Sequence, residues 1–368
     1  MQKKLLALAL AAAFAAPAFA ATSNVDVGGY INMSVDYLDP DRADEDGNMN
    51  ISSNSSNIYF KGTEDLGGGL KAIWQIQTYF SVGGTGNADS GVLGEGEKDG
   101  VASGNTYLGL QGGWGMVLAG KHDTPYKLVG RKYDFFDNQI GDSRNIINAV
   151  SIDYGGLVYA GMDARPNNMI AYGTPNINGF SALLAYVTNA GENDATNDDS
   201  VDAWSVSAGY DNGPLSISVA YQQANTSETN LVPEDQSAWR VGASYAFGDF
   251  KVAGLYQQDQ DILGISDLDY DAWGLGAAYK MGAFTIKGQY YNGEFDVTGL
   301  NDAEADMWAL GVDYALSKRT TLYAAYAGMS NGDDMLLTPF GGGHGDNPTF
   351  SDFGGDPSGF SLGMIHAF

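Results

Sequence analysis

The chain has 368 residues, no cysteine and a formal net charge of −27. The missing cysteines exclude disulfide frameworks, thiolate metal sites and cysteine nucleophiles. The acidic excess argues against a nucleic-acid partner, because phosphate backbones would be repelled. Glycine is abundant (51 residues) and proline is scarce (10 residues), which indicates many turns and closely packed strands rather than collagen or disorder.

Residues 1–20 are typical of a secretory signal peptide. A short basic tip is followed by an apolar stretch, and the segment ends in the small-residue pattern Ala18-Phe19-Ala20. The apolar stretch is shorter than the roughly 20 residues that span a bilayer as a helix. We therefore expect cleavage before Ala21 and a single mature domain over residues 21–368, in which no later segment is apolar enough to form a spanning helix.

Beyond the signal segment the hydrophobic pattern repeats every two residues, and no convincing helical repeat is found. In the segment 284–290, for example, Phe284 and Ile286 alternate with Thr285 and Lys287. The alternation predicts an all-β fold with sixteen strands. They are expected to begin near Val25, Asn57, Leu70, Asn105, Met116, Asn168, Phe180, Val201, Leu215, Ala238, Phe250, Asp271, Phe284, Asp306, Thr320 and Gly359.

Short connections such as Gly248-Asp249 alternate along the chain with long polar ones. The long connections are expected at residues 39–55, 81–104, 122–167, 190–200, 224–237 and 329–357. Tight turns at one rim and long loops at the other are the plan of an antiparallel transmembrane β-barrel of the outer membrane, with the turns on the periplasmic side. Tyrosines near the predicted strand ends fit its two interfacial girdles. Sixteen strands would also enclose an aqueous channel.

Four stretches of the sequence resemble a known family. They are Ile58–Ala72, Gly112–Pro125, Arg165–Phe180 and Leu316–Tyr323. In this order they resemble the second and third strands, the start and the end of the constriction loop, and the last short turn of the neisserial-type general porins of Gram-negative outer membranes. The alternating C-terminal strand, which ends in Phe368, is similar to the assembly signal that the outer-membrane insertion machinery reads in such proteins.

This resemblance implies a homotrimer of sixteen-stranded barrels in outer-membrane lipid and lipopolysaccharide. It implies that the third long loop, here residues 122–167, folds into the lumen and narrows it. Passive diffusion of ions and small hydrophilic solutes would follow, without a cofactor. A field across the lumen, between basic and acidic side chains, would then filter permeants by charge.

Charged residues of the loop and of the facing strands are the expected constriction. They are Lys61, Lys71, Lys121, Asp123, Asp134, Asp137, Arg144 and Arg165. We expect Lys61, Lys121 and Arg165 to form a basic wall opposite Asp134 and Asp137, since a lysine that faces lipid near the midplane costs about 2 to 4 kcal/mol.

Two features work against a strong anion preference. The family often has arginine where this chain has Asn57, and acidic residues crowd the predicted external loops. An acidic mouth concentrates cations. The basic wall and the acidic mouth favour opposite ions, so the sequence leaves the ion preference open.

Other functions remain as alternatives: a substrate-specific channel, a surface barrel that is not a channel, or a secreted β protein. An enzyme is not expected, because the only histidines are His122, His344 and His366 and no zinc motif is present. The stretch 341–346 favours a flexible loop tip over a calcium-binding repeat. Aromatic residues 133, 135 and 136 favour packing of the loop over a stack that guides sugars.

Overall fold

The fold was determined as a computed structural model. It describes residues 23–43, 46–82, 101–151, 158–188, 202–225, 234–296, 303–345 and 352–368. The expected signal peptide and its cleavage site lie outside the described residues. Among those described, no helix has the length and apolar character needed to cross a bilayer.

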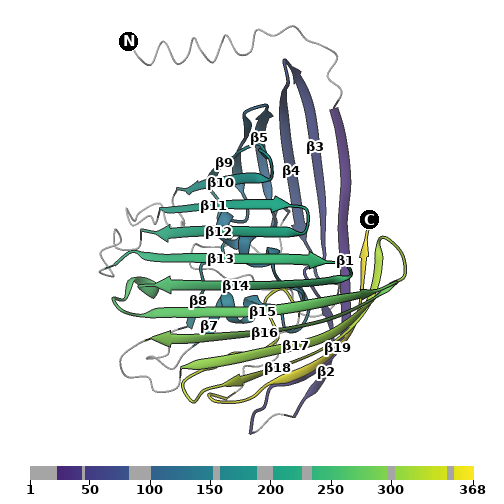
Figure 1. The fold of residues 1–368 in the computed structure, drawn as a ribbon, viewed down its shortest axis with the longest axis vertical. Coiled ribbons are helices and arrows are strands. Elements are labelled where there is room, and N and C mark those ends of the chain that lie inside the picture. The colour runs from purple at the N-terminus through teal and green to yellow at the C-terminus, as the bar shows by residue number, and fades with distance from the viewer. Residues whose placement is uncertain are drawn as a thin grey trace.

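Sixteen antiparallel wall strands close into a barrel (Figure 1). Every expected strand start lies within two residues of an observed one. The first half of the wall contains β1 (Ser23–Asp39), β3 (Asn57–Gly67), β4 (Leu70–Tyr79), β5 (Thr106–Gly112), β6 (Gly115–Lys121), β9 (Met169–Gly173), β10 (Phe180–Val187) and β11 (Ala203–Asn212). The second half contains β12 (Leu215–Ala224), β13 (Gln236–Phe247), β14 (Phe250–Gln260), β15 (Asp269–Met281), β16 (Phe284–Asp296), β17 (Glu304–Ala315), β18 (Thr320–Asn331) and β19 (Ser358–Ala367).

The first strand closes the barrel. One half of β1 pairs with β3, from Ser23 to Tyr30, and the other half pairs with β19, from Tyr30 to Asp39. A further strand, β2 (Asn48–Ser53), also pairs with β1 and leads directly into β3. The expectation of a loop throughout residues 39–55 was therefore wrong, because β2 extends the wall strand beyond a short break at residues 54–56.

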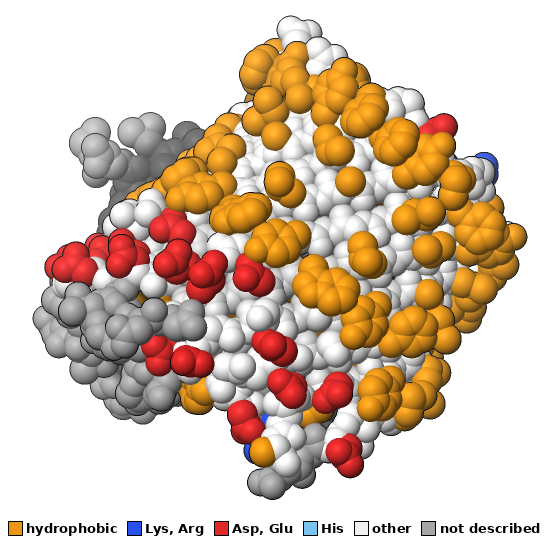
Figure 2. Space-filling view, turned by 60° about the horizontal axis from the view of Figure 1, so that its bottom comes forward, with side chains coloured by type: hydrophobic (Ala, Val, Ile, Leu, Met, Phe, Trp, Pro, Cys, Tyr) orange, Lys and Arg blue, Asp and Glu red, His pale blue; other side chains and the backbone are white. Residues whose placement is uncertain are grey.

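The two faces of the wall differ as the alternation predicted. Large apolar side chains such as Leu275, Leu310 and Leu362 point outward and are exposed, and Figure 2 shows them as a broad hydrophobic band. Near the long loops the band is edged by pairs of tryptophan and tyrosine on neighbouring strands, such as Trp273 with Tyr290. Such rings suit the interface between lipid and water.

The described parts of the long connection between β6 and β9, residues 122–151 and 158–168, lie inside the barrel and contain structure of their own. They hold α2 (Pro125–Lys132), α3 (Arg144–Ile147), β7 (Ala149–Ser151) and β8 (Val158–Ala160). These short helices were not expected from the sequence. We call residues 122–167 the constriction loop, keeping the predicted bounds.

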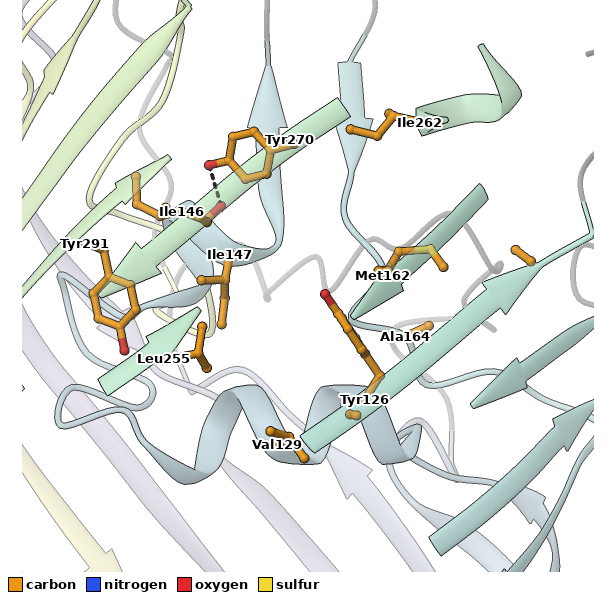
Figure 3. Packing of buried hydrophobic residues seen from close by; sticks show 14 of the residues in the cluster. Tyr126, Val129, Ile146, Ile147, Met162, Ala164, Leu255, Ile262, Tyr270 and Tyr291 are labelled. Atoms are coloured by element: carbon orange, nitrogen blue, oxygen red, sulfur yellow. Dashed lines mark hydrogen bonds between the residues drawn. The ribbon is translucent and has the colours of Figure 1, made fainter. Parts of the chain in front are cut away.

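The main hydrophobic core lies between this loop and the inner face of the wall. Tyr126 and Val129 from α2 and Ile146 from α3 are buried together with Leu255 and Tyr270 of the wall. Figure 3 shows this packing and the hydrogen bond that the Tyr270 hydroxyl donates to the Ile146 carbonyl (3.0 Å). The core therefore holds the loop against one side of the barrel.

Candidate functional site: the constriction loop and the inner wall

The constriction loop begins with a capped helix that lies along the wall. Thr124 is the N-cap of α2 and accepts a hydrogen bond from the Lys127 amide (3.3 Å), while Pro125 occupies the first turn. Both features favour a helix start. The helix packs against β11, β12 and β13, and α3 packs against β15 and β16. The loop thus follows the wall for much of its circumference.

Small wall residues make room for the aromatic side chains of the loop. Tyr133 is buried over Gly242, where a Cβ atom would come within 2.2 Å of the ring. Phe136 is buried in a cluster with Ala309 and Ala327. These two rings pack against the wall and do not stack along the lumen.

A buried ion pair fixes the returning arm of the loop. Arg240 on β13 donates to Asp163 (2.7 Å), and neither side chain is exposed to solvent. Arg240 also donates to Gln257 (2.9 Å) and to the Tyr126 carbonyl (3.2 Å), and its guanidinium lies 4.0 Å from the centre of the Tyr126 ring. One wall arginine therefore joins the first helix of the loop to its last segment.

Asp123 and Arg165 meet at the base of the loop, where it leaves and rejoins the wall. The two side chains are buried and joined by a hydrogen-bonded ion pair (2.9 Å), and Lys127 lies 3.5 Å from the same carboxylate. Burial alone would raise the pKa of Asp123, but Arg165 and Lys127 outweigh it and hold that pKa well below its ordinary value. These two expected site residues hold the loop together.

A second group of charges lies at the tip of the loop. Arg144 is buried and donates to Asp142 (2.7 Å), while Asp137 accepts a two-pronged hydrogen bond from Arg131 (2.8 and 2.9 Å). Burial raises the pKa of Asp137, but Arg131 and Arg144 outweigh it and lower that pKa. The Asp137 side chain is 38% exposed and that of Arg131 is 24% exposed. This pair is therefore a charged part of the loop that solvent reaches.

Asp134, expected opposite the basic wall, has a structural role. Its carboxylate accepts hydrogen bonds from the Ser143 amide (3.0 Å) and from the Gln289 side chain (2.8 Å) on β16. It also accepts one from the Phe136 amide (2.8 Å). These bonds fold the loop tip on itself and tie it to the wall.

Lys61 and Lys71 face inward, as expected, and each has an acidic neighbour. The strand register places Lys61 directly opposite Asp26 of β1 and Lys71 directly opposite Asp65 of β3. Side chains at such positions point to the same face and lie close together. The sequence predicted the face of these lysines but not the carboxylates that balance them.

Lys121 differs from the expected basic wall. It ends β6 opposite Thr106, and the alternation of β6 places it on the side of Val117 and Ala119. Those two residues are exposed on the outer face, while Leu118 between them is buried inward. The strand geometry therefore does not bring Lys121 to the lumen beside Lys61.

The glycine-rich stretch 341–345 is packed inside the barrel, so the expectation of a flexible loop tip was wrong. His344 is buried and lies 3.1 Å from the carboxylate of Asp36 on β1. A Cβ atom on Gly343 would come within 2.2 Å of the Arg144 guanidinium. Glycine here allows the last long connection to rest against the constriction loop. Sequence spacing gave no signal for this contact, because His344 and Asp36 are far apart in the chain.

The expected acidic mouth is only partly described, since residues 44–45 and 189–201 lie outside the described part. Asp259, near the loop end of β14, is one of the acids expected in this mouth, but it is buried and accepts a hydrogen bond from the Tyr126 hydroxyl (3.0 Å). Other acids face outward above the aromatic pairs: Asp271, for example, accepts a hydrogen bond from the Tyr256 hydroxyl (2.6 Å). Figure 2 shows acidic side chains gathered along this edge. Within the described ranges, no group of three His, Asp or Glu side chains could hold a metal ion.

Comparison with known proteins finds similarity to outer-membrane porins. The sequence profile described as Gram-negative porin matches residues 7–334. Outer membrane porin protein 32 of Delftia acidovorans is 32% identical over 245 residues, which are 64% of this chain and 63% of that protein. Major outer membrane protein P.IB of Neisseria gonorrhoeae is 30% identical over 203 residues, covering 52% of this chain and 51% of that protein. The chain therefore aligns with about half to two thirds of the length of these relatives.

Solved structures share the fold. An anion-selective porin from Comamonas acidovorans superposes with a TM-score of 0.73 at 27% identity, covering 94% of this chain and all of that one. OmpT of Vibrio cholerae superposes with a TM-score of 0.65 at 17% identity, covering 94% of this chain and 98% of that one. The second likeness concerns the fold alone.

Proposed function

Because the chain belongs to the Gram-negative porin family and folds as an outer-membrane barrel, we propose that it forms a water-filled channel for passive diffusion of ions and small hydrophilic solutes. The observation that carries this proposal is the docking of the constriction loop along the inner wall of the barrel. The loop contacts β10–β18 and, at its tip, Asn32 of β1, while β3 and β4 present the inward lysines 61 and 71. Solvent-exposed charge on Arg131 and Asp137 remains at the loop tip.

Conductance across a planar bilayer tests the proposal. Purified, heat-modifiable protein should produce stepwise, ohmic conductance increments. Correctly folded protein that produced none would refute a channel and favour a surface barrel without transport. A zero-current potential under a salt gradient would then report the ion preference.

Charge balance supports weak rather than strong selectivity at the β3–β4 wall. Lys61 and Lys71 each lie opposite a carboxylate, and Asp123 neutralises Arg165 at the loop base. A Lys61→Gln variant should therefore shift the reversal potential toward cations by only a few millivolts, and the Lys121→Gln variant should shift it less.

Assembly and partners are part of the same proposal. We expect a homotrimer in outer-membrane lipid and lipopolysaccharide, delivered after removal of residues 1–20 and inserted by the machinery that reads the strand ending in Phe368. The family and the alternating β19 support this. Conductance steps in groups of three and N-terminal sequencing of the membrane form, expected to begin at Ala21, test it. The proposal also includes that the protein has no enzymatic activity and uses no cofactor.

A further inference from the structure

Two lysines near the short-turn rim face the lumen side by side. Lys251 is the second residue of β14 and pairs with Ala278 of β15, and Lys280 lies two residues further along β15. Even-numbered residues of β15 and odd-numbered residues of β14 point inward, since Trp273, Leu275 and Val252 are exposed outward. Strand spacing and rise place the two Cα atoms about 8 Å apart. Both lysine side chains are exposed.

Lys251 differs from the other inward lysines of the described wall and loop, because it has neither an ion pair nor a carboxylate opposite it in the register. Lys132 binds Asp211 (2.9 Å) and Lys287 binds Asp313 (3.1 Å). Lys61 and Lys71 have carboxylates opposite them in the register.

Lys251 and Lys280 form no ion pair among the described residues. Lys251 lies between Ala246 and Ala278 in the neighbouring strands. Asp249 is in the exposed turn at the rim, and its main-chain oxygen accepts a hydrogen bond from the Lys280 amide (2.9 Å). Asp249 thus lies opposite Lys280 in the register, and the two lysines carry one positive charge more than this carboxylate balances.

Phe135 of the constriction loop lies beside Lys251. The Lys251 ammonium lies 5.6 Å from the centre of the Phe135 ring, which is half-buried. A Cβ atom on Gly276 would come within 2.5 Å of that ring, so the glycine allows Phe135 to lie close to the wall. The Phe135 amide donates to Gln289 (3.0 Å), which fixes the ring. Phe135 thus lies over Lys251, while Lys280 is nearer the rim.

We propose that Lys251 and Lys280, beneath Phe135, form a binding site for small dianionic solutes on the periplasmic side of the constriction. Two flexible ammonium groups at this spacing can each reach one end of a short dicarboxylate, or together hold one phosphate group. The site rests on the proposed channel function, because it would concentrate anions that have passed, or are about to pass, the constriction.

Succinate and inorganic phosphate are the probes, and acetate is the monovalent control. Folded wild-type protein in detergent should bind succinate or phosphate in saturation-transfer NMR and calorimetry. In a planar bilayer, either dianion should reduce single-channel conductance in a saturable manner. Acetate at equal ionic strength should not.

The double variant Lys251→Gln/Lys280→Gln should weaken binding and block at least tenfold. Lys318→Gln/Arg319→Gln is the matched control, because it removes the same charge from an exposed turn at the same rim. This control should change dianion binding and conductance block less than twofold. Equal weakening in both variants would show general electrostatic attraction and overturn the site. Unchanged binding in the Lys251 and Lys280 variant would also overturn it.

The absence of cysteine allows a rescue experiment. Lys251→Cys should lose block, regain it after reaction with aminoethyl methanethiosulfonate, and remain without it after the sulfonate analogue. Failure of the positively charged adduct to restore block would count against the site. Dianion binding by a protein that does not conduct would refute the channel but support the site. Conduction without dianion binding would support the channel but refute the site.

Discussion

Arg240→Ala is the substitution that should most directly release the constriction loop. Arg240 is fully buried and donates to Asp163, Gln257 and the carbonyls of Tyr126 and Ile147. Truncation would leave the carboxylate of Asp163 buried without its cation. Removing one partner of a buried ion pair costs about 3 to 5 kcal/mol. The barrel strands keep their hydrogen bonds, so we expect this cost to fall on docking of the loop.

Trypsin cleavage of the folded barrel measures the docking. The loop contains Lys127, Arg131 and Arg144, which are cleavage sites only when the loop leaves the wall. A cost of about 3 to 5 kcal/mol raises the population of the undocked loop by about 10² to 4 × 10³ fold. Cleavage within residues 127–144 should accelerate by the same factor when opening is fast relative to proteolysis.

A double variant separates loss of the ion pair from loss of volume. Arg240→Met combined with Asp163→Leu removes both charges and keeps apolar bulk, so cleavage should return toward the wild-type rate. Cleavage of Arg240→Ala at the wild-type rate would refute the anchoring role. Equal acceleration in the single and double variants would show that shape, and not the buried charge, determines docking.

Three further substitutions test other contacts of the inserted segments. Gly242→Ala should push Tyr133 from the wall, because the added Cβ atom would come within 2.2 Å of the ring, and trypsin should then cleave the loop faster. Gly113→Ala is the control: Gly113 has open space around it, so the cleavage rate should not change. Because the pKa of Asp123 is lowered, its stabilising charge is present at all pH values above about 4 and is lost only as the pH falls through that lowered value. The ratio of trypsin cleavage rates between Asp123→Asn and wild type should therefore stay constant from pH 6 to 9. A ratio that falls toward one at pH 6 would contradict this. His344→Ala should lower the free energy of unfolding by about 1 to 3 kcal/mol, because its buried carboxylate partner loses a contact; an unshifted urea transition on a heat-modifiability gel would show that the contact adds nothing.

The wall of the barrel could be predicted from the sequence because its signal is local. Inward and outward residues alternate along each strand, and turns such as Gly248-Asp249 mark the hairpins. Strand starts at Asn57, Leu70 and Phe284 were therefore correct to the residue. The strand β2 was missed, because its short sequence lies in a polar stretch and is stabilised by pairing with β1.

The interior of the barrel was predicted less well, because its contacts join residues that are far apart in the chain. Arg240 and Asp163 are separated by 77 positions, and no spacing rule connects them. The sequence showed that residues 122–167 are rich in charge, but most of that charge is used internally. Asp123, Arg144 and Arg165 hold the loop together instead of lining the lumen as free charges.

Charge balance inside a barrel depends on strand register, which alternation alone does not give. Alternation assigns Lys61, Lys71, Lys251 and Lys280 to the inward face, so from the sequence they are equivalent. Register places a carboxylate opposite the first two and alanine beside Lys251. A net charge of −27 therefore coexists with a locally positive part of the inner wall at Lys251. The charge that a permeant encounters therefore depends on which residue of the neighbouring strand lies opposite each inward side chain. The register that sets these neighbours depends on how the barrel closes.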